Sequence, residues 1–171
     1  MWASQLFHTT RPRTFVSSGG AGTMGFGLPA AMGAQLGLPS SRVICITGDG
    51  SIQMNIQEMA TIRENELPVK VLLLDNNCLG MVRQMQEQFH DRRYSQTLFS
   101  CNPDFVALAR AYGWNGSKVE SPSELEAAMQ QWLASEEPAL LWIPIASDED
   151  VYPKDACDGS AKGVSDLRDE E

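Results

Sequence analysis

Two short runs of aliphatic residues dominate the hydrophobic pattern of this chain. Residues 43–47 read Val-Ile-Cys-Ile-Thr, and residues 69–74 read Val-Lys-Val-Leu-Leu-Leu. Runs that are apolar on both faces are typical of strands buried at the centre of a parallel sheet. Between them, residues 51–65 carry apolar side chains at helical spacing. The pattern therefore predicts a strand–helix–strand unit, in which the crossover is expected to be right-handed.

The same reasoning extends the predicted fold along the chain. Apolar residues at helical spacing predict four more helices, and further apolar runs predict three more strands. We expect the helices over residues 28–38, 81–90, 103–112 and 122–134, and the strands over residues 14–17, 114–119 and 139–145. Because strands and helices alternate, the fold class is expected to be α/β, with a mostly parallel sheet and helices on both faces.

Two of these helices carry further local signals. Met81, Val82, Met85 and Phe89 form an apolar stripe, and such a stripe indicates a helix face that packs against a core. Asn102 precedes a proline, so we expect its side chain to cap the helix that follows.

Length and composition bound the class of protein. The 171 residues, 43% hydrophobic and 20% charged, suit one soluble globular domain with a substantial core. We expect this domain to occupy residues 1–153. Residues 154–171 are rich in Asp, Glu, Gly, Ser and Lys, so they are expected to form an acidic, mobile tail.

Charge and targeting signals exclude several functions. The net charge of −9 argues against nucleic acid, since its binding depends on basic contacts to phosphate. No apolar run is long enough to span a membrane, and the N-terminus lacks the features of a signal peptide. The four cysteines form no CxxC pair, which favours reduced thiols in a cytoplasmic protein.

Each of the two buried strands is followed by a polar turn. Gly48, Asp49 and Gly50 follow the first strand, and Asn76 and Asn77 follow the second. Neighbouring parallel strands end at the same edge of a sheet, so we expect Asp49 and Asn76 to lie side by side. A carboxylate there would repel a diphosphate unless a divalent cation bridged the two. Mg²⁺ takes oxygen ligands and keeps substrate phosphates among them, so the two turns predict a magnesium–diphosphate site.

Neighbouring backbone groups extend this expected site. A main-chain carbonyl just beyond Asn76 would supply a third protein oxygen. Gly50 permits close approach of a ligand, and Ser51 opens a helix whose first N–H groups favour phosphate. Gly80 permits the same for Met81. Either turn alone is also an ordinary turn; it is their pairing after two buried strands that favours a site.

Five glycines fall within residues 18–27, between an expected strand and an expected helix. Such a stretch lets the backbone approach a ligand closely, although a flexible turn has the same composition. It does not fit the dinucleotide fingerprint, because no acidic residue ends the next strand.

The spacing of Gly48-Asp49-Gly50 and Asn76-Asn77 resembles the thiamine diphosphate signature. Four stretches extend the similarity to the acetolactate synthase (acetohydroxyacid synthase) large subunit, at residues 18–31, 48–54, 79–84 and 102–105. The resemblance covers roughly residues 1–153 and implies the family's C-terminal, thiamine diphosphate-binding domain. It implies an enzyme that condenses pyruvate with a second 2-keto acid, with loss of CO₂, in branched-chain amino acid biosynthesis.

The resemblance also implies roles for individual residues. Asp49 and Asn76 would be magnesium ligands, with the carbonyl of Cys78 as the third. Met24 would hold the cofactor in its bent form, and the main chain at Gly22 would accept a hydrogen bond from the cofactor's amino group. The residues that would surround the cofactor are Gly22, Met24, Asp49, Gly50, Ser51, Asn76, Cys78, Leu79, Gly80 and Met81.

The family's active site needs a residue that this chain does not carry. In the family, an N-terminal domain supplies across a dimer interface the glutamate that activates the cofactor. We therefore expect no catalytic residue here, no activity of this chain alone, and a homo-oligomer or partner chain that supplies the glutamate. A regulatory subunit is a further expected partner. Met85 stands where many members have a tryptophan involved in acceptor choice, so the second keto acid stays open.

Two further functions fit the same residues. The chain is also consistent with part of another thiamine diphosphate enzyme, such as a 2-keto acid decarboxylase or glyoxylate carboligase. It is consistent, too, with a non-catalytic remnant or pairing module. The glycine-rich stretch and residues 79–84 favour acetolactate synthase.

Overall fold

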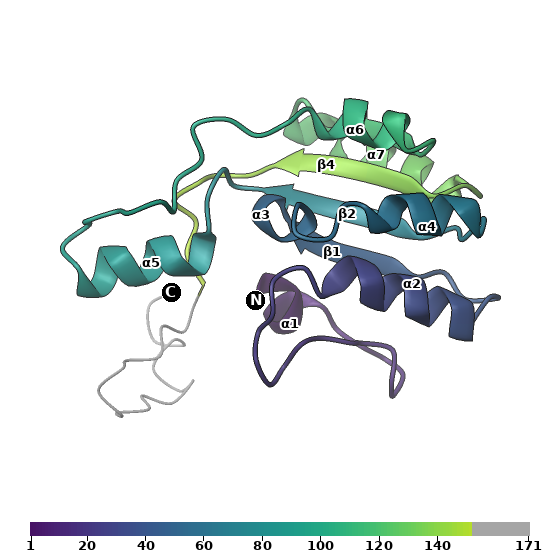
Figure 1. Cartoon of the computed structure of the whole chain (residues 1–171), viewed down its shortest axis with the longest axis horizontal. Coiled ribbons are helices and arrows are strands. Elements are labelled where there is room, and N and C mark those ends of the chain that lie inside the picture. The colour runs from purple at the N-terminus through teal and green to yellow at the C-terminus, as the bar shows by residue number, and fades with distance from the viewer. Residues whose placement is uncertain (152–171) are drawn as a thin grey trace.

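A single four-stranded parallel sheet organises the computed structural model, which describes residues 1–151 (Figure 1). The strands lie in the order β1–β2–β4–β3, and every neighbouring pair is parallel. Their bounds are Ile44–Gly48 for β1, Lys70–Asp75 for β2, Asn115–Lys118 for β3 and Ala139–Pro144 for β4. The predicted α/β class with a parallel sheet is confirmed. The tail predicted for residues 154–171 lies outside the described residues.

Helices cover both faces of this sheet. Cys45, Val71 and Leu73 point to one face, where α2, α4 and α6 close the larger core. Leu72 and Leu141 point to the other face, where α7 packs with Trp132 in a smaller core. The helices are α1 (Trp2–Leu6), α2 (Gly27–Gly37), α3 (Asp49–Ile52), α4 (Glu58–Glu64), α5 (Gly80–Phe89), α6 (Phe105–Ala111) and α7 (Leu125–Ala134).

The single helix expected over residues 51–65 is wrong, because it divides into α3 and α4. Residues 53–57 form turns instead, with the N–H of Asn55 bonded to the carbonyl of Ile52. The side chain of Asn55 donates to the carbonyl of Gly25 at 2.9 Å. This bond to a distant loop stabilises the turns at the expense of a continuous helix. Asparagine side chains commonly act in this way, because they bond to backbone groups.

Two smaller expectations also differ from the structure. No strand forms at residues 14–17. Asp104, and not Asn102, caps α6, where its carboxylate accepts from the backbone N–H of Ala107 at 2.9 Å. The side chain of Asn102 instead donates to Asp75, the last residue of β2.

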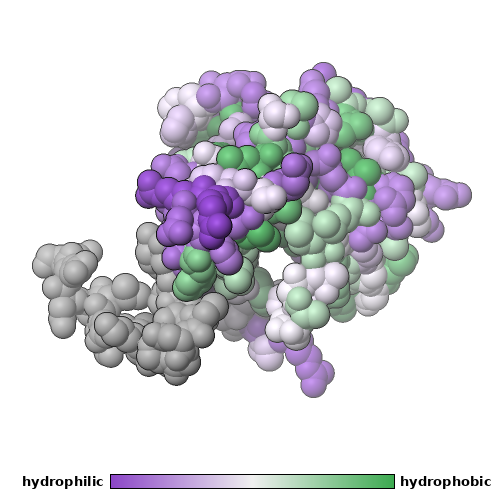
Figure 2. All heavy atoms as spheres, turned by 60° about the vertical axis from the view of Figure 1, so that its left-hand side comes forward, coloured by the Kyte–Doolittle hydropathy of each residue, from purple (hydrophilic) through white to green (hydrophobic). Residues whose placement is uncertain are grey.

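The apolar stripe of α5 does not face a core, which overturns the expectation from its helical spacing. Met81, Val82, Met85 and Phe89 are each more than 40% exposed. The buried residues of α5 are polar, and α5 extends beyond the end of the sheet (Figure 1). Figure 2 shows hydrophobic surface among hydrophilic side chains on the side of the molecule that carries this helix.

Neither membrane-spanning helices nor disulfides occur in residues 1–151. No helix there has the length and apolar composition to cross a bilayer. Cys45, Cys78 and Cys101 are free thiols, as predicted for them. Cys157 lies outside the described residues.

The central strand β2 provides a test of this core. Leu73 is fully buried between β1 and β4, so we expect Leu73→Ala to lower the free energy of unfolding by about 2–5 kcal/mol. Leu36→Ala is the matched control, since Leu36 is 58% exposed on α2 and its loss should change stability by less than about 0.5 kcal/mol. Urea denaturation of both variants measures the difference, and equal effects would contradict the assignment of the core.

Candidate functional site

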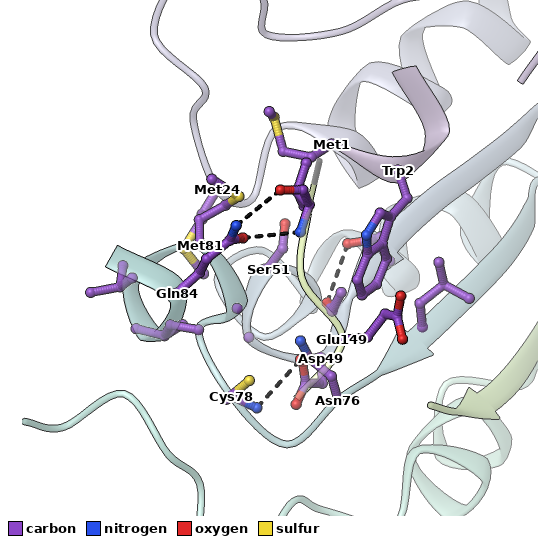
Figure 3. Close-up of a pocket in the computed structure, with 18 of the residues that line it drawn as sticks. Met1, Trp2, Met24, Asp49, Ser51, Asn76, Cys78, Met81, Gln84 and Glu149 are labelled. Atoms are coloured by element: carbon purple, nitrogen blue, oxygen red, sulfur yellow. Dashed lines mark hydrogen bonds between the residues drawn. The ribbon is translucent and has the colours of Figure 1, made fainter. Parts of the chain in front are cut away.

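An open pocket of about 410 Å³ lies where β1 and β2 end, and residues from distant parts of the chain line it. The structure brings together there all ten residues that the sequence placed around a cofactor. They are Gly22, Met24, Asp49, Gly50, Ser51, Asn76, Cys78, Leu79, Gly80 and Met81. Figure 3 shows Met24 and Met81 on one side of the pocket and Asp49, Asn76 and Cys78 at another.

The parallel pairing of β1 with β2 places the two polar turns beside each other. Gly48 pairs with Leu74, so Asp49 and Asn76 leave the same edge of the sheet (Figure 3). Asp49 is 1% exposed and Asn76 is 8% exposed. The side-chain oxygen of Asn76 accepts from the N–H of Cys78 at 3.4 Å, which curves the backbone after β2 around the pocket.

Two glycines are required by close contacts in these turns. A Cβ atom at Gly50 would lie 2.9 Å from Leu79 and 3.3 Å from the terminal methyl of Met24. A Cβ atom at Gly80 would lie 2.8 Å from the amide nitrogen of Asn76. Both glycines therefore let side chains of the pocket pack directly against the backbone at its floor. The first turn of α5 begins there without a side-chain cap, so its N–H groups are suited to an anion.

The glycine-rich loop is tied to the same floor by hydrogen bonds. The N–H of Gly25 donates to the hydroxyl oxygen of Ser51 at 3.0 Å, and the carbonyl of Gly25 accepts from Asn55. Gly22 and Gly25 both have positive φ angles, which glycine adopts without strain. These contacts hold Met24 against the turn that carries Asp49.

The site also contains an acidic residue that the sequence did not single out. Asp75, the last residue of β2, is 2% exposed and accepts from the indole N–H of Trp142 at 2.8 Å. Burial raises the pKa of Asp49 to about 6 from its ordinary value of 3.8. A hydrogen bond from Asn102 opposes this shift, and the nearby Asp75 adds to it. The sequence pointed to Asp75 only through its place directly before Asn76.

The donor set fits a hard cation with oxygen ligands. Among residues 1–151, no group of three His, Cys, Asp or Glu side chains is arranged to hold a metal. A cation in this pocket would instead rely on the carboxylate of Asp49, the amide oxygen of Asn76 and main-chain carbonyls, which suits Mg²⁺. Burial raises the pKa of the Cys78 thiol, and the oxygen that Cys78 would offer such a cation is its main-chain carbonyl.

Two segments from opposite ends of the described chain form the remaining wall. The amide of Gln84 makes two hydrogen bonds to the backbone of Val151, at 2.9 and 3.0 Å. Arg83 forms ion pairs with Asp150 and Glu87, and it is 5% exposed at its side chain. The indole N–H of Trp2 donates to the carbonyl of Asp150 at 3.3 Å. The polar buried face of α5 therefore fastens the segment after β4 beside the pocket.

Comparison with known families and structures agrees with this geometry. Residues 1–143 match the family described as thiamine pyrophosphate enzyme, C-terminal TPP binding domain. Among solved structures, a thiamine diphosphate-dependent 4-hydroxybenzoylformate decarboxylase from Rhodococcus jostii RHA1 superposes with a TM-score of 0.65 and 33% identity. The match covers 74% of this chain and 24% of that chain.

Curated relatives with high identity are acetolactate synthase large subunits. The isozyme 2 large subunit of Escherichia coli K12 is 50% identical over 153 residues, which are 90% of this chain and 28% of that protein. A probable acetolactate synthase large subunit of Methanococcus aeolicus is 48% identical over 141 residues, or 82% of this chain and 24% of that protein. The chain thus spans about a quarter of the length of these relatives.

The raised pKa of Asp49 predicts how stability depends on pH without metal. Between pH 3.8 and about 6 the folded chain binds more protons at Asp49 than the unfolded chain, so this residue lowers stability as pH rises. Asp49→Asn should remove that fall and raise the melting temperature of the metal-free protein above pH 6. Scanning calorimetry from pH 4 to 8 measures it, with the exposed Asp91→Asn as control. A lower melting temperature for Asp49→Asn at pH 7.5 would contradict the assignment.

Proposed function

Because the chain belongs to the family of C-terminal thiamine pyrophosphate-binding domains, we propose that it is the cofactor- and magnesium-binding part of an acetolactate synthase. The observation that carries this proposal is the convergence of ten predicted residues on one pocket. Identity of 41–50% to acetolactate synthase large subunits supports the same enzyme. The proposed domain comprises residues 1–153, followed by the acidic tail.

We assign the diphosphate and its cation to the floor of the pocket. Asp49, Asn76 and the carbonyl of Cys78 would hold Mg²⁺, which would offset the buried charge of Asp49. Gly50 and Gly80 line the pocket and would lie against the diphosphate, with Ser51, Leu79 and Met81 beside it. The first turn of α5 would direct N–H groups to the same anion.

Met24 and Gly22 would orient the rest of the cofactor. Met24 lies over the turn at Gly50 and would support the bent form, while the main chain at Gly22 would accept from the cofactor's amino group. When bound, thiamine diphosphate supplies the chemistry for decarboxylating one 2-keto acid and transferring the remaining fragment to another. The residues of this chain would bind and orient it, and none is assigned a catalytic role.

The proposed reaction joins pyruvate to a second 2-keto acid with loss of CO₂, as a step of branched-chain amino acid biosynthesis in the cytoplasm. An activating glutamate from a partner chain or domain would complete the site, so we expect this chain alone to be inactive. The exposed apolar stripe of α5 borders the pocket and supports such a pairing surface. A regulatory subunit is a further proposed partner.

One observation favours a second candidate function. The solved structure from Rhodococcus jostii RHA1 is, as its name states, a 4-hydroxybenzoylformate decarboxylase, so a decarboxylase is the second candidate. The identity of 33% in that match is lower than the 50% to acetolactate synthase isozyme 2, which favours the first proposal. A glyoxylate carboligase or a non-catalytic pairing module would also be compatible with the residues of the pocket.

A chimaera tests the reaction. Residues 1–153 would replace the matched region of the Escherichia coli isozyme 2 large subunit, which supplies the remaining domains. We expect this chimaera to convert pyruvate to acetolactate, measured by product analysis. The same chimaera with Asp49→Ala is the inactive control. Acetaldehyde without acetolactate would point to a decarboxylase, and a folded chimaera without product would point to a pairing module.

Calorimetry tests the assignment of the metal. Asp49→Ala removes the one carboxylate in the proposed ligand set, so Mg²⁺-dependent binding of thiamine diphosphate to the purified chain should fall below detection. Asp91→Ala, at an exposed position, should bind like the wild type. Unchanged affinity of Asp49→Ala would remove Asp49 from the ligand set.

A further inference from the structure

Asn102 connects the two buried carboxylates of the site. Its amide nitrogen donates to Oδ2 of Asp49 at 2.7 Å and to Oδ1 of Asp75 at 2.9 Å. It also lies 3.3 Å from the side-chain oxygen of Asn77. An amide group has two N–H donors, and the two shortest contacts both go to carboxylates. Asn102 thus lies between two like charges that would otherwise repel each other.

The orientation of this amide is fixed from its other side. The side-chain oxygen of Asn102 accepts from the amide of Gln53 at 3.4 Å. The same nitrogen of Gln53 donates to the main-chain carbonyl of Asp49 at 3.0 Å. With its oxygen directed to Gln53, the nitrogen of Asn102 must face Asp49 and Asp75. This assigns which end of the amide faces the acids.

A backbone pairing holds the segment before Asn102 against the turn after β2. Leu79 donates its N–H to the carbonyl of Thr97 at 2.8 Å, and Phe99 donates to the carbonyl of Asn77 at 2.9 Å. Cys78 and Leu98 form an antiparallel bridge between these bonds. Asn102 therefore enters the site on a segment that is fastened to the proposed metal-binding turn.

Asp75 is anchored independently of Asn102. The indole of Trp142 donates to Oδ2 of Asp75 at 2.8 Å, and the N–H of Asn77 donates to Oδ1 at 3.0 Å. The side chain of Asp75 is therefore held in place at the end of β2. The amide of Asn102 extends from Asp75 to Asp49, so it limits the rotation of the carboxylate that faces the pocket.

We propose that Asn102 is a positioning residue for the cation site. It holds Oδ2 of Asp49 against Asp75, so that Oδ1 of Asp49 is presented to a divalent cation bound with a diphosphate. Residues that orient a metal ligand in this way typically change metal affinity by about 10- to 100-fold when they are removed. This inference rests on the proposed function, because it takes Asp49 as a ligand.

The test measures the Mg²⁺ requirement for binding thiamine diphosphate. The cofactor is titrated into the full chain by calorimetry at a series of Mg²⁺ concentrations, for the wild type and for Asn102→Ala. We expect the Mg²⁺ concentration for half-maximal binding to rise about 10- to 100-fold in Asn102→Ala. Asn115→Ala is the matched control, since Asn115 bonds to Ser135 away from the site and should leave this concentration unchanged.

A structural role alone would give a different result. It would lower the melting temperature of the metal-free Asn102→Ala protein without changing its Mg²⁺ requirement, and that outcome would overturn the inference. Asp49→Ala separates the two proposals. If Asp49→Ala loses binding and Asn102→Ala does not, only the inference about Asn102 fails. If Asp49→Ala binds like the wild type, or the wild type binds no cofactor, the metal assignment and the inference both fail.

Nuclear magnetic resonance of the wild type provides a measurement that needs no folded variant. The side-chain N–H resonances of Asn102 should shift when Mg²⁺ is added with thiamine diphosphate. The shift should be half-maximal at the Mg²⁺ concentration that calorimetry gives for half-maximal binding of the cofactor. The side-chain resonances of Asn115 should not move. Unchanged Asn102 resonances on saturation with Mg²⁺ and cofactor would overturn the inference.

Discussion

A carboxylate buried directly after β1 is the constraint on which this structure depends. Asp49 is 1% exposed and lies near Asp75, which is 2% exposed. Two such charges repel each other, and donors from Asn102, Trp142 and the backbone of Asn77 offset the repulsion. A cation bound at Asp49 would offset the same charge. The fold therefore keeps a destabilising group at the position where the proposed function needs a metal ligand.

The strands and the two turns could be predicted because their signals are local. The runs that became β1 and β2 are apolar on both faces, a pattern typical of strands in a parallel sheet. The interior position expected for both is confirmed for β2 alone, since β1 lies at the edge of the sheet and leaves Ile44 exposed. Once these strands are neighbours, chain direction alone places Asp49 and Asn76 at one edge. Most of the candidate site therefore follows from short stretches of sequence and a single rule of sheet geometry.

The contacts that complete the site could not be predicted in this way, because they join residues far apart in sequence. Asn55 bonds to Gly25 and interrupts an expected helix, although its own neighbours favour helix. Asn102 follows the pattern of a helix cap, yet Asp104 caps α6 and Asn102 contacts the acids instead. In each case a polar side chain could bond either to the local backbone or to a distant residue, and the tertiary fold decides between the two.

The helix α5 shows the same limit and extends it to the surface. Its apolar stripe has the spacing of a core face, but the face that is buried carries Arg83 and Gln84, which fasten residues 149–151. A hydrophobic stripe indicates that a helix face is to be covered. It does not indicate whether the core of the same chain or another chain covers it. Because Met81 belongs to this exposed stripe and also lines the pocket, a partner covering α5 would exclude water from the site. Under the proposed function, pairing and cofactor binding would then stabilise each other, since both would cover Met81 and the partner would shield the bound cofactor from water.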